Sequence, residues 1–365
     1  MAFIAEHLVT RTPVFNRNRD IIFHRLQMAA PAQDAVTPFM LRLANIETPQ
    51  AVYFVPLAWV QDEVIFDKLN TSTVLVAANA DEALTAKAFG YRIATAWEQD
   101  QPDPFEADFR LVPFGRNLPL TPDSILVGIE TTQHFEGALA GAGMYFSGDA
   151  SVTAASTTGS KRINPAHTLI LELMSAVQQE ADAKAIEVMF KRDIALSFKL
   201  LRYINSPGFG LASRIDSIRH ALSILGYQQL LKWLSLLAAT AGQSTSPALT
   251  QTAITRARLM ELLGTKRLEK RDADNLFMTG MLSLLDRIIG LPLPEILANA
   301  NLPPAITEAL LHRTGKYQRF LQLAEACEGI QTAAAENLID IDAKAVNIAH
   351  LEAVEWATQI TRDAT

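Results

Sequence analysis

Cysteine is nearly absent from this 365-residue chain, in which Cys327 is the only one. A single thiol cannot form an internal disulfide, which is typical of proteins in a reducing compartment, so a cytoplasmic location is expected. Glu325 and Glu328 lie close to the thiol in sequence, and nearby carboxylates disfavour a thiolate. We therefore interpret Cys327 as a small core residue and not as a nucleophile.

The chain also lacks long apolar runs and an excess of positive charge. Its longest apolar stretch, Leu230–Ala241, is interrupted by Lys232 and Ser235 and is too short to span a bilayer. The formal net charge of −7 gives no general attraction to nucleic acid. The sequence therefore predicts neither a membrane nor a nucleic-acid partner.

Two widespread catalytic motifs are missing as well. There is no Gly-x-Ser-x-Gly elbow, and there is no Gly-x-x-x-x-Gly-Lys-Ser/Thr phosphate loop, since Gly159–Lys161 lacks the required earlier glycine. The best candidate for a local basic patch lies near the start of the chain. It consists of Arg11, Arg17, Arg19, His24 and Arg25, and Asp20 lies among them. We interpret this segment as a solvated face, with a local phosphate-binding patch as the alternative.

The first 150 residues contain short apolar runs of strand length, flanked by turn formers such as Pro56 and Pro113. The runs are Ala51–Val55, Thr73–Ala77, Tyr91–Ala94, Phe109–Val112 and Ser124–Ile129. A helical pattern lies between two of them, with Asp81 as its expected N-cap and Gly90 as its end. This order of strand, helix and strand predicts an α/β domain with parallel strands.

From Asn164 onward the apolar residues recur at helical spacing. The stretch Ser213–Gly226 has Ser213 as a possible cap and Gly226 as a stop, and the stretch Asp193–Asn205 carries two adjacent apolar stripes, one of which includes Phe198. Such a wide apolar face predicts a helix buried among other helices. Between the two halves, Ser151–Arg162 is small and polar and is interpreted as a linker, with an ordered loop as the alternative.

Asp193–Gly226 reads DIALSFKLLRYINSPGFG and then, after a short gap, IDSIRHALSILG. This stretch resembles the signature of HDOD domains, D-x-x-L-S-x-K-L-L-R-x-x-N-S, then F-G, then S-I-x-x-A-x-x-x-L-G. HDOD domains are helical relatives of HD-type phosphohydrolases that lack the metal site, and the resemblance implies a signalling and protein-interaction module. No His-Asp dipeptide occurs in the chain, and the matching place, Gly280–Asp286, carries Ser283 and Leu284. A leucine cannot ligate a metal, so no metal is expected here.

The first half is similar to EAL domains in three places, Arg11–Leu26, Ile125–Thr131 and Gly141–Gly148. Together with the HDOD signature, this order resembles the EAL–HDOD family of bacterial signalling proteins. EAL enzymes hydrolyse cyclic di-GMP with two metal ions held by carboxylates and an asparagine at the ends of barrel strands. The resemblance places Arg25 where the catalytic glutamate is expected and Pro56 where the asparagine is expected, and Ala94–Trp97 replaces an Asp-Asp pair. Only Glu130 matches a family carboxylate, and one carboxylate cannot hold two metals, so the resemblance implies no metal or other cofactor. Glu130 is interpreted as structural, with Arg25 and Glu130 as vestigial positions of the EAL site as the alternative.

Length gives an independent argument about this domain. A complete (β/α)8 barrel takes about 200–250 residues, and only about 150 precede the linker. The sequence thus predicts an incomplete TIM-barrel-like α/β domain over residues 1–150, a linker over 151–162 and an all-α helical domain over 163–365.

The predicted interaction site is the loop that follows the HDOD signature helix, formed by Asn205, Ser206, Gly208, Phe209 and Gly210. Its glycines permit turns that other residues resist. Phe209 is interpreted as a core plug, and an exposed docking aromatic is the alternative.

Three functions follow as hypotheses. The leading one is a non-enzymatic signalling protein that acts through contacts with other signalling proteins. The alternatives are a cyclic di-GMP phosphodiesterase or nucleotide phosphohydrolase, and a protein that binds cyclic di-GMP without hydrolysis through Arg17, Arg19 and Arg25. Nucleic-acid binding is disfavoured by the acidic charge balance.

Overall fold

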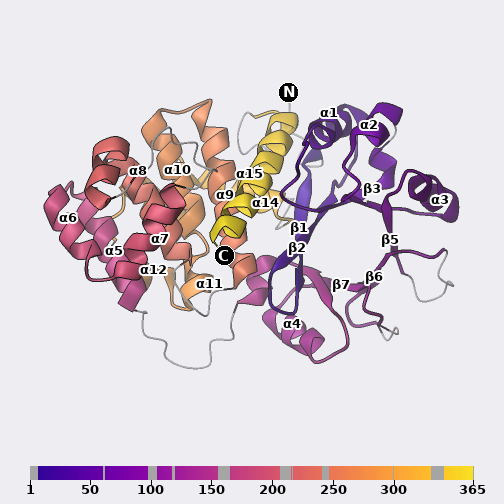
Figure 1. Cartoon of the computed structure of the whole chain (residues 1–365), viewed down its shortest axis with the longest axis horizontal. Coiled ribbons are helices and arrows are strands. Elements are labelled where there is room, and N and C mark those ends of the chain that lie inside the picture. The colour runs from indigo at the N-terminus through magenta and orange to yellow at the C-terminus, as the bar shows by residue number, and fades with distance from the viewer. Residues whose placement is uncertain are drawn as a thin grey trace. The chain divides into compact units, whose positions relative to one another are not determined.

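The computed structural model describes residues 7–60, 62–97, 105–116, 120–154, 165–205, 215, 217–240, 246–298, 300–329 and 341–364. The chain forms two compact units (Figure 1). The first comprises Met1–Thr153 with Glu325–Leu351, and the second comprises Ala154–Ala324 with Glu352–Thr365. These two units are defined by contacts in space. The predicted domain limits at residues 150 and 162 were instead based on composition, and they stay predictions. Most of the predicted linker, residues 155–162, lies outside the described residues.

The first unit is a closed barrel of strands in the order β1 to β8 (Figure 1). The strands are β1 (Thr10–Asn16), β2 (Ile21–Gln27), β3 (Tyr53–Pro56), β4 (Val74–Val76), β5 (Arg92–Ala96), β6 (Phe109–Pro113), β7 (Ser124–Ile129) and β8 (Tyr145–Gly148). Strand β1 is antiparallel to both of its neighbours, β2 and β8. All other neighbouring pairs, from β2–β3 to β7–β8, are parallel. The α/β class with parallel strands is therefore confirmed.

The predicted incompleteness of the barrel is wrong. The strands are short, from three residues in β4 to seven in β1 and β2. Strands β1 and β2 are joined by a tight turn, and the described residues between β5 and β6 and between β6 and β7 form no helix. Eight strands therefore close within Thr10–Gly148 without a helix in the described residues of these connections, and the length argument failed because it assumed a full βα unit for each strand.

Helices lie in the remaining connections: α1 (Gln33–Ala44), the 3-10 turn η2 (Leu57–Trp59), α2 (Glu63–Lys68), α3 (Ala80–Ala88) and α4 (Thr132–Leu139), with η3 (Ala150–Thr153) after β8. The N-cap of α3 is Asn79 and not the predicted Asp81, because the Asn79 side chain accepts a 3.0 Å bond from the Glu82 N–H. Gly90 follows the helix with φ +84°, as its predicted end requires.

Rings fill the barrel. Phe23, Phe54 and Phe109 are buried in one apolar cluster and meet in pairs at centroid distances of 5.0–5.3 Å. Edge-on contacts of this kind add to the energy of burial. Residues two positions apart in a strand lie on the same face. Arg25, two residues after Phe23 in β2, therefore lies on the interior face of the barrel with it.

The second unit is helical, which confirms the all-α prediction. Its helices are α5 (Pro165–Gln178), α6 (Ala183–Phe190), α7 (Ile194–Ile204), α8 (Ile218–Thr240), α9 (Pro247–Thr265), α10 (Lys270–Leu282), α11 (Leu285–Ile289), α12 (Leu293–Leu297), α13 (Pro304–Thr307), the π-turn η5 (Glu308–His312), α14 (Gln318–Cys327) and α15 (Ala343–Ala364). The ends Glu325–Cys327 of α14 and Ala343–Leu351 of α15 belong to the first unit. No helix in the described ranges is long and apolar enough to cross a membrane.

Two details of the helical predictions differ in the structure. Helix α8 begins at Ile218 with Ser217 as its cap, since the Ser217 hydroxyl accepts a 3.1 Å bond from the His220 N–H, and the predicted cap Ser213 lies outside the described residues. Gly226, the predicted stop, is a non-helical break (φ 75°, ψ 175°) after which the helix resumes. Helix α7 buries Leu196 and Leu200 but exposes Phe198, so the prediction of two buried stripes is wrong.

Candidate functional sites

The carboxyl ends of the parallel strands are where barrel enzymes hold their catalytic groups. Arg25 lies near that end of β2, paired with Phe54 of β3, and is largely buried. Burial lowers the pKa of its guanidinium. Among the described residues, none forms a hydrogen bond or ion pair with the Arg25 guanidinium. Pro56 closes β3 beside Val76 of β4, so the neighbouring strand end presents a side chain without a ligating atom.

Glu130, the other predicted vestigial position, follows β7 and is exposed. The strand register shifts between Val127 and Ile129, where Gly128 has a φ of +83°. Strands β1 and β8 lie between β2 and β7 in the barrel order, so the structure does not bring Glu130 and Arg25 onto neighbouring strands. A pair of metal ions needs several carboxylates in one place, and these two residues do not provide them.

The basic segment does not form one solvated face. Arg11 and His24 are 0% and 2% exposed, so the prediction of solvation is wrong for both. Arg17 donates to the carbonyl oxygens of Gly141 and Gly143 at 3.1 and 2.9 Å. Arg17 and Arg19 lie in the turn before β2, whereas Arg25 lies near the other end of that strand. The three arginines therefore do not gather around one phosphate.

Sequence reasoning missed a buried cluster in the barrel unit. Arg11 Nη1 lies 3.4 Å from His24 Nδ1, and because arginine only donates, His24 accepts there and carries its proton on Nε2. His350 and Cys327 are buried in the same unit. Burial and the charge of Arg11 lower the pKa of His350 to about 3, and they hold the pKa of His24 well below its ordinary value. Both imidazoles are therefore neutral at physiological pH.

Cys327 is a buried core residue, as predicted. Burial and then the Glu328 carboxylate raise the pKa of its thiol to about 12. A thiol in this state is a poor nucleophile.

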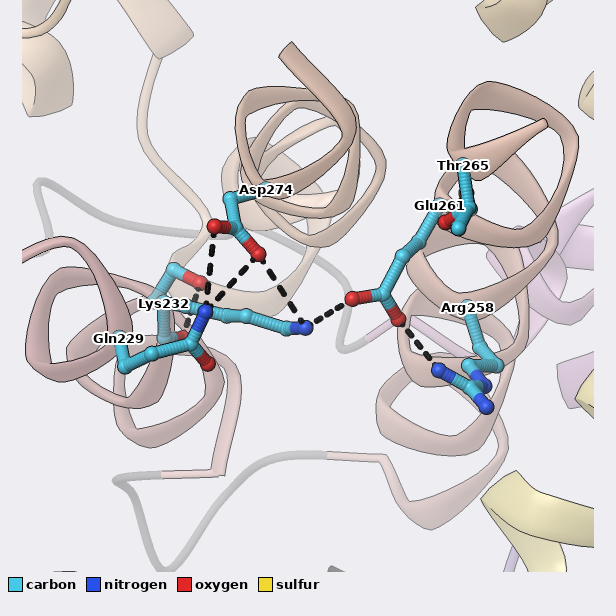
Figure 2. Close-up of polar contacts among 7 residues, drawn as sticks. Gln229, Lys232, Arg258, Glu261, Thr265 and Asp274 are labelled. Atoms are coloured by element: carbon cyan, nitrogen blue, oxygen red, sulfur yellow. Dashed lines mark hydrogen bonds and ion pairs between the residues drawn. The ribbon is translucent and has the colours of Figure 1, made fainter. Parts of the chain in front are cut away.

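The helical unit contains a buried network of charged side chains around Lys232 (Figure 2). The Lys232 side chain of α8 extends between Glu261 of α9 and Asp274 of α10. Its Nζ pairs with Glu261 Oε1 and lies 3.7 Å from Asp274 Oδ1. Each of these three side chains is at most 10% exposed. The one sequence signal for this network was the lysine that interrupts the apolar run of α8.

Further donors complete the network on both sides. Gln229 Nε2 lies 3.0 and 3.1 Å from the two carboxylate oxygens of Asp274, and Arg258 Nη1 donates to Glu261 Oε2 at 2.6 Å (Figure 2). Two cations therefore face two carboxylates. Burial raises the pKa of Asp274, an effect that Lys232 and Gln229 oppose. Lys232 also lies 4.5 Å from the centroid of Phe277, a cation–π contact.

The segment Gly280–Asp286, where the HDOD resemblance predicts the position of the lost His-Asp pair, contributes to helix packing. Ser283 Oγ accepts a 2.8 Å bond from Arg256 Nη1 and donates to the Gly280 carbonyl at 2.6 Å. Gly280 itself lies against α9, where an added Cβ would stand 2.6 Å from Ala257 Cα. Within the part of the chain that the structure describes, no group of three or more His, Cys, Asp or Glu side chains could hold a metal ion.

Of the predicted interaction loop, the structure describes Asn205 alone. Ser206, Gly208, Phe209 and Gly210 lie outside the described residues, so the plug and docking interpretations of Phe209 stay predictions. The Asn205 amide spans the base of this loop. Its Nδ2 donates at 2.7 Å to the carbonyls of Leu201 and Ile215, and its Oδ1 accepts at 2.8 Å from the Ile215 N–H. One side chain thereby fixes both ends of the segment between α7 and α8.

Comparison with known proteins identifies the helical region. Residues 163–295 match the HDOD domain family. A stretch of 191 residues is 27% identical to the uncharacterized protein YuxH of Bacillus subtilis and covers 51% of this chain and 46% of YuxH. A stretch of 207 residues is 30% identical to the cyclic di-GMP phosphodiesterase CdgJ of Vibrio cholerae and covers 55% of this chain and 48% of CdgJ. The match thus spans about half the length of these relatives.

Solved structures give more distant likenesses. A putative phosphohydrolase from Shewanella amazonensis has a TM-score of 0.39 and 15% identity over 56% of this chain and 94% of its own. An HDOD domain protein of unknown function from Geobacter sulfurreducens has a TM-score of 0.32 and 13% identity over 45% of this chain and 72% of its own. Likenesses this distant carry no functional argument. The chain therefore contains an HDOD domain at residues 163–295 and is related to YuxH and CdgJ.

Proposed function

We propose that this chain is a non-enzymatic signal-transduction protein of the cytoplasm, that its barrel is a degenerate EAL-type domain, and that it acts through contacts with other signalling proteins. One observation carries the proposal: Arg25 and Pro56 occupy the strand ends where the EAL resemblance implies a glutamate and an asparagine. A guanidinium repels a metal cation and has no lone pair to offer it. The chemistry of the two-metal reaction therefore lacks its ligands at these positions.

The HDOD half supports the same proposal. Ser283 and Leu284 stand where a metal-ligating His-Asp pair would be, and Ser283 is engaged by Arg256. The buried carboxylates of Glu261 and Asp274 are already matched by Lys232 and Arg258. An internal ammonium that offsets buried carboxylates leaves no net negative charge to attract a metal ion.

Cyclic di-GMP binding or hydrolysis is the second candidate, and two observations favour it. CdgJ, a relative at 30% identity, is a cyclic di-GMP phosphodiesterase. Arg25 is largely buried without a described counter-charge, and a guanidinium in that position can bind a phosphate. In this variant the barrel senses the nucleotide without cleaving it.

Incubation of the full chain with cyclic di-GMP and magnesium or manganese separates these functions. We expect no linear dinucleotide above a control without protein, with CdgJ as the positive control. Metal analysis of the purified chain should give less than one zinc, iron, magnesium or manganese ion per chain. Turnover that disappears in Glu130→Ala would refute the proposal. Calorimetric binding of cyclic di-GMP that Arg25→Ala abolishes would instead establish that the barrel senses the nucleotide without cleaving it.

A further inference from the structure

Helix α7 presents a large apolar side chain to solvent. Phe198 is 66% exposed, although Leu196 and Leu200 on the same helix are 3% and 0% exposed. Ala195, Lys199 and Arg202 are exposed as well and lie within one turn of Phe198. We refer to Ala195, Phe198, Lys199 and Arg202 as the α7 face. It combines an aromatic ring with two cations.

These two cations differ from the cations around them. Lys191 and Arg219 both pair with Glu187, at 3.0 Å for Lys191, and Arg192 pairs with Glu172 at 3.2 Å. In the described part of the chain, neither the Lys199 nor the Arg202 side chain forms an ion pair or a hydrogen bond. Residues 191–202 contain four basic residues and one acidic residue, in a chain whose net charge is −7. The α7 face is therefore a local positive surface, whose two cations no ion pair with another described residue offsets.

The helix that carries this face is fixed at both ends. Asp193 Oδ1 accepts a 3.0 Å bond from the Leu196 N–H at the start of α7, and the Ser197 hydroxyl donates to the Phe190 carbonyl at 3.0 Å. Asn205 bonds to Leu201 and Ile215 at the other end. A surface held this firmly loses little conformational entropy when a partner binds to it.

We infer that the α7 face is the docking surface for an acidic amphipathic segment of a partner protein, with an apolar side chain on Phe198 and carboxylates against Lys199 and Arg202. This inference rests on the proposed function, because a protein that acts through contacts needs a surface for its partner. Charge complementarity selects the acidic partner. A lipid surface is disfavoured, since the α7 face carries two cations, Lys199 and Arg202, whereas basic clusters that bind anionic membranes carry about 4–8.

Site-specific crosslinking of the full chain tests this inference. A benzoylphenylalanine at position 198 is activated by light in cells that encode the protein, and the same residue at position 84 is the matched control. Leu84 is 67% exposed, almost the same as Phe198, but lies on α3 of the barrel unit. We expect position 198, and not position 84, to capture a protein through a segment in which acidic residues flank an aliphatic or aromatic one.

Binding of a synthetic peptide with the captured sequence then gives the magnitude. Phe198→Ala should raise the dissociation constant on the order of 30-fold, as expected for the loss of an aromatic anchor. The double variant with Lys199→Glu and Arg202→Glu should raise the dissociation constant at least as much, and the affinity should no longer depend on the salt concentration. Leu84→Ala should leave the dissociation constant unchanged. All variants alter exposed side chains, so their melting temperatures should match that of the unchanged chain within about two degrees.

Several results would overturn the inference. They are no capture at position 198, capture of a segment without acidic residues, crosslinking only to a second copy of this chain, and an affinity that Phe198→Ala leaves intact. Sedimentation with vesicles of phosphatidylglycerol tests the lipid alternative, which Phe198-dependent binding would establish. Cyclic di-GMP turnover is measured separately: if the chain hydrolyses the nucleotide and position 198 still captures an acidic segment, the proposed function fails and the docking surface stands.

Discussion

Each unit of this protein buries a cation, but the surroundings of the two cations differ. In the barrel unit, Arg11 is 0% exposed and lies against the neutral imidazole of His24. In the helical unit, Lys232 is 8% exposed and lies between the carboxylates of Glu261 and Asp274. The first arrangement keeps nearby histidines deprotonated, whereas the second joins three helices through opposite charges.

This difference predicts different weaknesses. A carboxylate that loses its buried cation remains as an uncompensated charge, which is costly in a medium of low dielectric constant. Neutral histidines beside a cation are instead sensitive to acid, because the unfolded chain can take up protons that the native cluster refuses. The helical unit should therefore respond most to charge removal and the barrel unit to low pH.

The largest effect is expected from Lys232→Met. This change leaves Asp274 and Glu261 buried without the ammonium between them, so the free energy of unfolding should fall by about 3–5 kcal/mol. Urea denaturation of the purified chain measures it. Adding Asp274→Asn removes one of the stranded charges and should recover part of the loss. A loss below about 1 kcal/mol in Lys232→Met would mean that water reaches the network.

Acid should weaken the barrel unit through His350. Its pKa is lowered from 6.5 to about 3, so below pH 6.5 the unfolded chain binds a proton that the native chain does not. Stability is therefore complete above pH 6.5 and falls as the pH is lowered toward 3, by about 1.4 kcal/mol per pH unit, or about 2 kcal/mol at pH 5.

The variant His350→Gln separates this contribution from those of other titrating groups. Glutamine cannot take up a proton. The slope of unfolding free energy against pH between 6.5 and 4 should therefore decrease by the contribution of about one proton, or about 1.4 kcal/mol per pH unit. Equal slopes for the two proteins would show that His350 binds a proton as readily in the native state as in the unfolded one.

A smaller effect is expected at the base of the loop between α7 and α8. Asn205→Ala leaves the Ile215 N–H and two carbonyl oxygens without the amide, which should cost about 1–2 kcal/mol. Hydrogen exchange of the Ile215 amide reports the change directly. The control is Asn205→Asp, which keeps the acceptor for this N–H and should preserve more of its protection.

The smallest effect is expected at Cys327. With a thiol pKa of about 12 and no exposed surface, native Cys327 should not react with iodoacetamide at pH 8. Mass spectrometry should detect labelling only after urea unfolds the chain. Rapid labelling of the native protein would show that the barrel unit opens locally around this residue.

The sequence by itself determined the character of local elements. The helical spacing of the second half, the strand-length apolar runs of the first half and the helix end at Gly90 all reflect interactions between residues close in the chain. The absence of a His-Asp pair is likewise a property of the sequence. The burial of Cys327 followed from its residue type, and its acidic neighbours predicted an unreactive thiol.

Tertiary structure decided what distant residues do to one another. Barrel closure depended on how eight short strands pair with one another, and no single strand encodes that. Lys232 meets a carboxylate 29 residues away in α9, and Arg11 and His24 are buried although their segment is rich in charge. Phe198 belongs to an apolar stripe that predicts burial, yet the helices that cover Leu196 and Leu200 do not cover it. Burial is set by the neighbours that packing supplies, and periodicity identifies a face without naming what lies against it.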